Sequence, residues 1–207
     1  MSSSQPLAIA GHGEQRLIIW RNQTNENAEK MLAIVLTGAM ALTLFTACGS
    51  NAVTEKDIAD AMNDMAKAAE EDITFTPRAK EREMAKAIAA LSDEDLKELE
   101  EYLKNRSLPE KAEEILGINP GGENEKSRFV WCGATYTDEL GTSGQALNFM
   151  TQVMDKPANA DKLRGKNPAD DRYMGTALYK TVDKNGKQVT KRIIVVTATA
   201  EEDKDKD

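Results

Sequence analysis

The sequence predicts an α+β domain in which several helices precede a strand, a helix and a β-hairpin. Residues 54 to 117 place apolar side chains at helical spacing. After the Pro- and Gly-containing loop 119 to 122, residues 128 to 137 are rich in aromatic and β-branched side chains, and two similar runs follow within residues 173 to 199. We therefore expect one domain, residues 54 to 200, with an antiparallel sheet of about three strands covered by helices.

Two helices are expected at the start of this domain. Thr54 is a favourable N-cap, and Asp57 in the first turn suits the helix dipole, so the first helix runs from here to about residue 72. Residues 73 to 75 read as an extended link. The pair Thr76-Pro77 then predicts an N-cap followed by proline at the first helical position, with the second helix ending near Leu91.

Three more helices are expected further along the chain. Ser92 to Asp95 opens the third. Ser107 to Glu110 is typical of a capping box for a short fourth helix, which stops at Gly117 because glycine readily takes the left-handed conformation. Ser143 is the expected cap of a helix in the second half of the domain.

The strands follow from composition. Residues 128 to 137 are apolar on both faces, which predicts a strand in the centre of the sheet. A loop rich in Pro, Asn and Asp is expected at residues 156 to 171. Residues 173 to 182 and 187 to 199 read as two strands joined by Asp183-Lys-Asn-Gly186, a strong hairpin signal because Asn and Gly tolerate positive φ.

One long apolar run precedes the domain. Met31 to Ala47 holds seventeen residues without a charge, whereas a membrane-spanning helix needs about 20, so the run has the length of a signal peptide core. The segment Phe45-Thr46-Ala47-Cys48 resembles the lipobox of bacterial lipoproteins, with Phe45 where leucine is usual. The resemblance implies cleavage before Cys48, a diacylglyceryl group on its thiol, and a tether from residue 48 to 53. The chain would then sit on the extracytoplasmic face of the cell membrane, with the lipid bilayer as partner.

Two other readings of this run remain open. It is an uncleaved signal anchor, or it is a buried core helix in which Cys48 is a small apolar residue. Residues 1 to 30 fit no ordinary basic leader, since they carry three acidic and three basic side chains. We treat them as an extension of doubtful status, with Met31 as an alternative start, and exclude them from the fold.

Charge and rare residues limit the partners and the chemistry. The chain has a net charge of -8, which disfavours nucleic acid and anionic lipid headgroups as partners. The only histidine is His12, so the part from Cys48 onward has none. Cys132 is the only other cysteine, which leaves no intrachain disulfide once Cys48 is acylated. The final residues, 201 to 207, are all charged and predict a solvated tail.

Five parts of the domain form a further pattern: the apolar helix Ile58 to Asn63, the helix Phe149 to Met154, the segment Lys156 to Asn159, Leu163, and the strand Tyr173 to Ala177. Together they resemble the CAP superfamily, which includes the cysteine-rich secretory proteins. The resemblance implies a secreted α-β-α sandwich. It also implies a cleft, which we assign to Asn63, Asn159, Tyr136 and Tyr173.

The resemblance does not extend to the family's proposed metal and catalytic-like site. That site uses two histidines with acidic partners, and Asn159 stands where one of them would be. Because asparagine neither binds zinc as imidazole does nor titrates near neutral pH, we expect no metal site there. Nucleophile pairs that need histidine are excluded for the same reason. We expect no catalytic residues and no cofactor.

Two remaining features have ordinary structural explanations. Cys132 lies within a predicted strand, where a small buried side chain is the simpler reading than a nucleophile. The acidic groups at residues 93 to 95, 113 to 114 and 170 to 171 could bind Ca²⁺ or act as an acid/base pair, but solvated charge explains them equally well.

The sequence therefore favours a membrane-anchored extracytoplasmic lipoprotein that acts as a non-enzymatic binding or interaction module. An envelope protein or a glycan is the expected partner. The alternative is an exported carboxylate-dependent hydrolase that acts on envelope glycan or peptide. A structural envelope lipoprotein whose helices pair with a partner is a third reading.

Overall fold

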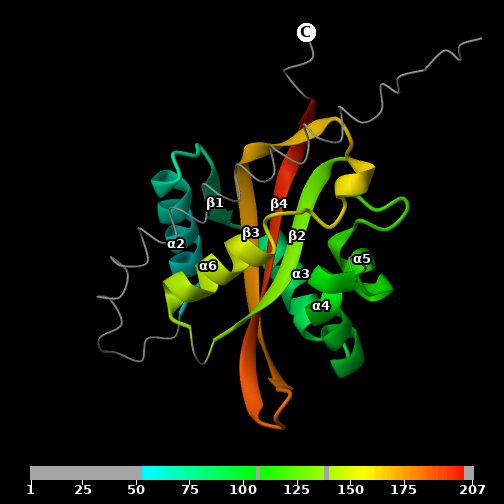
Figure 1. Cartoon of the computed structure of the whole chain (residues 1–207). Helices are drawn as coiled ribbons and strands as arrows, with labels where there is room; N and C mark the ends of the chain where they lie inside the picture. Colours follow the sequence, from blue (N-terminus) through cyan, green and yellow to red (C-terminus); the bar gives the residue numbers. More distant parts are fainter. Residues whose placement is uncertain (1–52, 106–107, 138–139, 203–207) are drawn as a thin grey trace, which may run out of the picture.

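The computed structural model describes residues 53–105, 108–137 and 140–202. These residues form a layered domain in which a sheet lies between helices (Figure 1). In chain order, its elements are α2 (Glu55–Ala68), β1 (Thr74–Pro77), α3 (Ala79–Ala89), α4 (Asp93–Asn105), α5 (Glu110–Leu116), β2 (Arg128–Tyr136), α6 (Thr142–Gln152), the short 3₁₀ helix η1 (Ala160–Lys162), β3 (Lys166–Val182) and β4 (Gln188–Glu202).

The sheet is mixed, with strand order β1-β3-β4-β2. β4 pairs antiparallel with both β3 and β2. β1 pairs parallel with β3, from Thr74 opposite Asp171 to Pro77 opposite Met174. β3 and β4 are much longer than their neighbours, so their connected end projects beyond the helices as a free hairpin (Figure 1).

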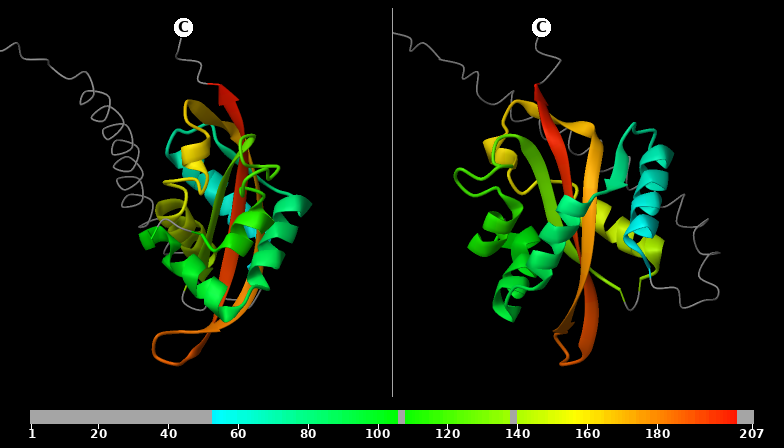
Figure 2. Two further views of the ribbon diagram at one scale, coloured as in Figure 1. Left: turned by 90° about the vertical axis from the view of Figure 1, so that its right-hand side faces the viewer. Right: turned by 180° about the vertical axis from the view of Figure 1, so that it is seen from behind.

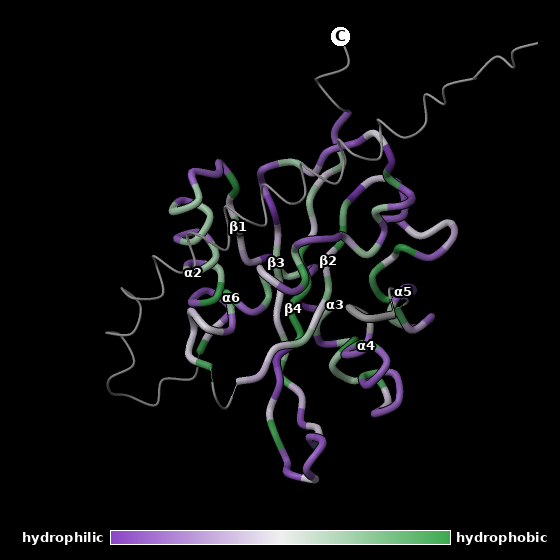
Figure 3. Tube along the Cα trace, viewed as in Figure 1, coloured by the Kyte–Doolittle hydropathy of each residue, from purple (hydrophilic) through white to green (hydrophobic). Residues whose placement is uncertain are grey.

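Helices cover both faces of the sheet (Figure 2). Ile194 and Val196 of β4 pack with α2 and α6 on one face, whereas Ile193 and Val195 pack with α3, α4 and α5 on the other. Successive side chains of a strand point to opposite faces, so a strand between two helical layers is apolar throughout. Figure 3 shows hydrophobic residues in this central part of the sheet and mostly hydrophilic residues toward the end of the hairpin.

Two helix ends lie where the sequence predicts them, the N-cap at Thr54 and the C-terminal end at Gly117. Thr54 and Asp57 form a capping box at the start of α2, in which the Thr54 backbone N–H donates to the Asp57 carboxylate at 2.7 Å. Gly117 ends α5 with φ of 64°, the left-handed conformation that glycine takes without steric cost.

The predicted hairpin turn is also present. The Asp183 carboxylate accepts from the backbone N–H groups of Asn185 and Lys187 at 2.8 and 2.9 Å, and Gly186 has φ of 79°. These are the roles that Asp and Gly ordinarily take in turns, which is why local sequence predicts this feature well.

The expected three-stranded sheet proves to have four strands, because residues 74 to 77 form β1. The prediction that Thr76-Pro77 begins a helix was wrong, since α3 starts at Ala79 with Arg78 as its N-cap. Asn63 of α2 holds this segment extended, because its side chain accepts from the Phe75 backbone N–H at 2.6 Å and donates to the Phe75 carbonyl at 3.1 Å. Proline is tolerated here because β1 is an edge strand.

The prediction that residues 128 to 137 lie centrally was also wrong, because β2 is an edge strand. Both faces are apolar because a helical layer covers each of them: Trp131 packs in one core and Val130 in the other. The outer edge is closed at Val130, whose N–H donates to the Asn159 side chain and whose carbonyl accepts from Ala158.

Several element ends differ from those expected. The predicted loop 156 to 171 ends in strand, since β3 begins at Lys166 and bends at an irregularity between Pro168 and Arg172. β4 extends to Glu202, so the first two residues of the predicted tail belong to the sheet. The N-cap of α6 is Gly141 rather than Ser143. The expected cap Ser107 lies outside the described residues.

A glycine on β3 tests how closely the first turn of α3 packs on the sheet. A Cβ atom at Gly175 would lie 2.0 Å from the Arg82 backbone nitrogen. We expect Gly175→Ala to lower the free energy of unfolding by about 2–3 kcal/mol or more, because backbone must move to make room. Urea unfolding measures the effect. Gly141→Ala is the matched control, with nothing within 4 Å of the new Cβ; equal midpoints for both variants would contradict this packing.

Candidate functional site

The residues assigned to a cleft by sequence do not meet in one place. Asn63 is bonded to β1 at one edge of the sheet. Asn159 is bonded to β2 at the opposite edge, where its side chain accepts from Val130 at 3.1 Å and donates to the Arg128 carbonyl at 2.7 Å. Since both side-chain amides are engaged by backbone groups, these two asparagines position the chain.

The two tyrosines also lie apart. Tyr173 is stacked under the Arg78 guanidinium, 3.8 Å from the ring centroid. Tyr136 is at the end of β2, 43% exposed, with the Lys191 ammonium 4.4 Å from its ring centroid. The four predicted residues are therefore distributed over both edges and one end of the sheet.

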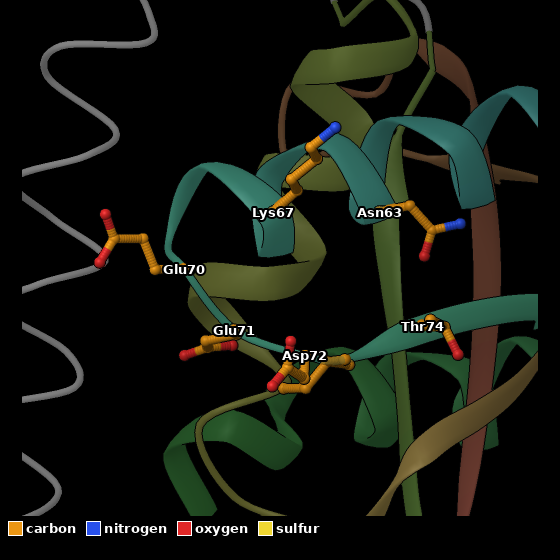
Figure 4. A pocket seen from close by; sticks show the side chains of 7 residues that line it. Asn63, Lys67, Glu70, Glu71, Asp72 and Thr74 are labelled. Atoms are coloured by element: carbon orange, nitrogen blue, oxygen red, sulfur yellow. The ribbon is translucent and has the colours of Figure 1, made fainter.

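Asn63 does line one surface pocket, of about 540 Å³, between the second half of α2 and β1 (Figure 4). Its carboxylates come from the turn that follows α2, where Glu70 and Asp72 are exposed to solvent. Catalytic carboxylates are usually desolvated or paired so that their pKa values separate. This pocket is a polar surface recess. Its lining residues are Asn63, Lys67, Glu70, Glu71, Asp72, Ile73 and Thr74.

A buried ion pair joins α3 to β4. Glu81 is fully buried and binds Arg78, whose Nε donates at 2.6 Å, and Thr197, whose hydroxyl donates at 2.7 Å. Burial alone would raise the pKa of the Glu81 carboxyl, but the hydrogen bonds from Arg78 and Thr197 outweigh it and hold the pKa below its usual value. Both Glu81 carboxylate oxygens have partners inside the fold, so this pair is structural.

A second buried pair lies under α4. The Tyr179 hydroxyl donates to one oxygen of Glu100 at 2.7 Å, and the Lys191 ammonium donates to the other at 2.5 Å. Burial, followed by the interaction with Glu100, raises the pKa of Tyr179, which keeps its hydroxyl protonated as a donor.

A third cluster surrounds Arg172. Its guanidinium carbon lies 5.1 Å from the Trp131 ring centroid and 5.8 Å from that of Phe75. Burial lowers the pKa of Arg172 to about 10. Its Nε and the Trp131 Nε1 are buried and find no hydrogen-bond partner among the described residues. The two aromatic faces compensate the cation in part.

The start of the domain is fastened to β4 by Arg192. Its guanidinium donates to the Gln145 side chain at 2.9 Å, to the Thr176 hydroxyl at 3.0 Å and to the Val53 carbonyl at 2.7 Å. Glu55 of α2 accepts from the Thr176 backbone N–H at 2.8 Å. The point where the chain enters the fold is thus fixed beside the base of the free hairpin.

The free hairpin carries two of the three large hydrophobic side chains that are exposed in the described residues. Leu178 and Val182 are 54% and 59% exposed, the largest values among the bulky hydrophobic side chains. Lys180 lies between them on the same strand face, and Lys184 and Lys187 are exposed at the turn. We call these residues the hairpin surface: Leu178, Lys180, Val182, Lys184 and Lys187.

The hairpin surface also contains an open sheet edge. The Asp183 backbone N–H donates to the Lys187 carbonyl. In this register, the backbone N–H and C=O groups of odd-numbered β3 residues point toward β4, and those of even-numbered residues point away from it, toward the open edge. The outward N–H of Thr176 is bound by Glu55. Beyond it, the outward backbone groups of Leu178 and Val182 have no partner among the described residues. Sequence reasoning missed this surface, although alternating Leu, Lys and Val before a lysine-rich turn was a visible signal.

Cys132 is a free, buried cysteine, as the sequence predicted. Burial raises the pKa of its thiol to about 12, so almost no thiolate exists near neutral pH. Within the described ranges, no group of three His, Cys, Asp or Glu side chains could hold a metal ion. No helix in the same ranges is long and apolar enough to cross a membrane.

No family model, curated protein or solved structure matches this chain.

The ion pair at Glu81 predicts a pH-dependent contribution to stability. Because the folded-state pKa is depressed below its usual value of 4.5, this contribution is complete above about pH 5 and is lost as the pH falls through the folded-state pKa. We expect Glu81→Gln to lower the free energy of unfolding by about 2 kcal/mol at neutral pH, and by much less at about pH 3. Urea unfolding at both pH values measures the difference in free energy of unfolding between the native chain and Glu81→Gln.

Glu83→Gln is the control on the same helix, because Glu83 is exposed and pairs with Lys86 at the surface. Its effect should stay within about 0.5 kcal/mol at either pH. A gap between the native chain and Glu81→Gln that does not shrink in acid would show that the carboxylate charge contributes nothing.

Proposed function

We propose that this chain is a membrane-anchored extracytoplasmic lipoprotein that acts as a non-enzymatic interaction module, with the hairpin surface as its contact region. The observation that carries the proposal is the pair of exposed aliphatic side chains, Leu178 and Val182, on an open strand edge. Exposed apolar side chains on an unpaired edge are an aggregation hazard that native proteins normally cover. Their presence at the end of a long hairpin favours a contact made there.

The position of the anchor supports the same proposal. Cys48 lies five residues before Val53, whose carbonyl is held by Arg192. Both hydrophobic cores are built from residues between Val53 and Ala200. Cleavage before Cys48 would therefore leave this folded unit intact on a short tether.

The proposal keeps the resemblance to the CAP superfamily only as a similarity in the order of helical and sheet layers. Helices on both faces of a sheet support an α-β-α sandwich. Asn63 and Asn159, at opposite edges of the sheet, do not form the cleft that the resemblance implies. A similar order of layers gives no evidence for a similar activity, because one architecture hosts many functions.

The alternative, a carboxylate-dependent hydrolase acting on envelope glycan or peptide, is less well supported. Its best location is the pocket beside β1, which has three carboxylates, Glu70, Glu71 and Asp72. Glu70 and Asp72 are exposed, whereas an acid/base pair needs one carboxyl group whose proton is retained by a drier environment.

Intact mass of the membrane fraction tests the anchor. We expect the chain to lack residues 1 to 47 and to carry the added mass of a diacylglyceryl group, because the lipobox thiol is acylated before cleavage. Globomycin, which blocks the lipoprotein signal peptidase, should leave the uncleaved form. Cys48→Ala should abolish acylation, while the control Cys132→Ala should not. An unmodified full-length chain in the soluble fraction would overturn the anchor.

A photo-crosslinking residue in place of Val182 tests the contact region. In cells, it should form adducts with a lipid or a protein, because Val182 is exposed on the hairpin surface. The same residue in place of Lys126, exposed just before β2 at the other end of the sheet, is the control. Adduct yields at Val182 no higher than at Lys126 would remove the hairpin as the contact region.

A further inference from the structure

We propose that the hairpin surface lies on the anionic headgroups of the same bilayer that holds the lipid on Cys48, which fixes the orientation of the domain. The inference rests on the lipid anchor proposed above. It names the bilayer surface, rather than a second protein, as what the hairpin contacts.

The lengths of the tether and the hairpin carry the first step. Leu178 is opposite Arg192 in the β3–β4 register, and Arg192 holds the Val53 carbonyl. The tether therefore joins the domain at the base of the free hairpin, and the start of α2 and the hairpin turn lie toward the same end of the domain (Figure 1).

The five residues from Cys48 to Val53 reach at most about 18 Å when fully extended. From Leu178 to Lys184, the hairpin advances by six residues, or about 20 Å. The tether is therefore no longer than the hairpin beside it. When the hairpin points toward the membrane, its turn must reach the surface in which the lipid is embedded.

Local charge favours that orientation. Lys180, Lys184 and Lys187 are exposed on the hairpin surface. Asp183, the carboxylate in the turn, accepts from two backbone N–H groups and stays ionised, so residues 178 to 190 carry three positive charges and one negative charge. Although the chain carries a net charge of -8, charges farther away than about 8–10 Å are screened at physiological salt. The net charge that predicted repulsion from anionic lipid therefore does not govern this end of the domain.

The apolar side chains fit the same surface. Leu178 and Val182 flank Lys180 on one face of β3. Short aliphatic groups can enter the boundary between headgroups and acyl chains, while lysine ammonium groups extend to the phosphates. The two acyl chains of a diacylglyceryl group already anchor the chain, so the basic patch would set the orientation of the domain.

A strand from another protein is a less favoured partner for this edge. An exposed lysine in the middle of an edge strand is a common device against pairing. In the antiparallel register that pairs all three outward residues of two copies, Lys180 would stand opposite Lys180, and like charges directly opposite are destabilising. The same lysine is favourable against phosphate.

A bimane label measures the contact directly. The full chain with Val182→Cys, purified from membranes, is labelled and placed in vesicles of phosphatidylcholine with phosphatidylglycerol, containing a headgroup nitroxide lipid. Lys126→Cys is the control position. The other thiol, Cys132, is buried and has a pKa of about 12, so it does not compete for the label. We expect quenching at position 182, none at position 126, and weaker quenching at position 182 in phosphatidylcholine alone.

Removal of the lysines tests the chemistry. Replacing Lys180, Lys184 and Lys187 by Gln should abolish the quenching, and replacing Lys80, Lys97 and Lys126 by Gln should not. In a chain that begins at Gly49, which lacks both the apolar run Met31 to Ala47 and the lipid site but keeps both hydrophobic cores, the hairpin changes should weaken flotation with phosphatidylglycerol vesicles roughly fivefold per lysine.

The outcomes separate the two proposals. Equal quenching at positions 182 and 126 in a chain whose mass shows the lipid would overturn the hairpin contact and leave the anchor intact. Quenching that survives loss of the three lysines would overturn the role of anionic headgroups. A crosslink from position 182 to a protein would overturn the bilayer contact and identify a protein partner at this edge instead. If the mass shows no lipid, the anchor fails, and lysine-dependent flotation of the chain that begins at Gly49 still decides for or against the hairpin.

Discussion

The burial of β4 on both faces is the constraint on which the rest of the structure depends. Residues 193 to 196 are fully buried between two helical layers, so every polar side chain on this strand needs a partner in those layers. Arg192 binds α6 and the Val53 carbonyl, Thr197 binds Glu81 of α3, and Lys191 binds Glu100 of α4. Each bond fixes one surrounding segment against the central strand, and together they set the position of the layers.

The same arrangement explains why one end of the domain remains uncovered. On one face, the layer of α2 and α6 accompanies β3 and β4 as far as the row that pairs Leu178 with Arg192. On the other face, α4 also covers the next row, where Tyr179 and Lys191 bind Glu100. The strands continue beyond both layers (Figure 1). Within the layers, the outward edge of β3 is closed by Arg78 and Glu55. Beyond them, Leu178 and Val182 have no such cover among the described residues. The surface proposed for contact is thus a consequence of strand length, not of a separate insertion.

Local chemistry made much of this fold predictable, and long-range pairing limited the rest. The capping box at Thr54, the end of α5 at Gly117 and the Asp183 to Gly186 turn depend on residues within a few positions, so sequence identifies them. β1 was missed because its pairing partner on β3 is almost a hundred residues away. β2 was placed centrally because burial by two helical layers and burial between strands give the same apolar pattern. The predicted cleft was wrong for a similar reason. Asn63 and Asn159 are polar residues that could line a cleft, but their side chains bind backbone groups at opposite edges of the sheet.

The orientation of the domain follows from combining the anchor with the hairpin. α2 begins near the hairpin base, where Thr176 binds Glu55, and runs away from the hairpin toward the pocket at Glu70 and Asp72 (Figure 1). A hairpin lying on the bilayer would therefore turn this acidic recess away from the membrane. The charge asymmetry acts in the same direction, because a lysine-bearing end is drawn to anionic headgroups while an acidic end is repelled from them. Net charge alone predicts no preferred orientation, whereas its distribution along the long axis of β3 and β4 does.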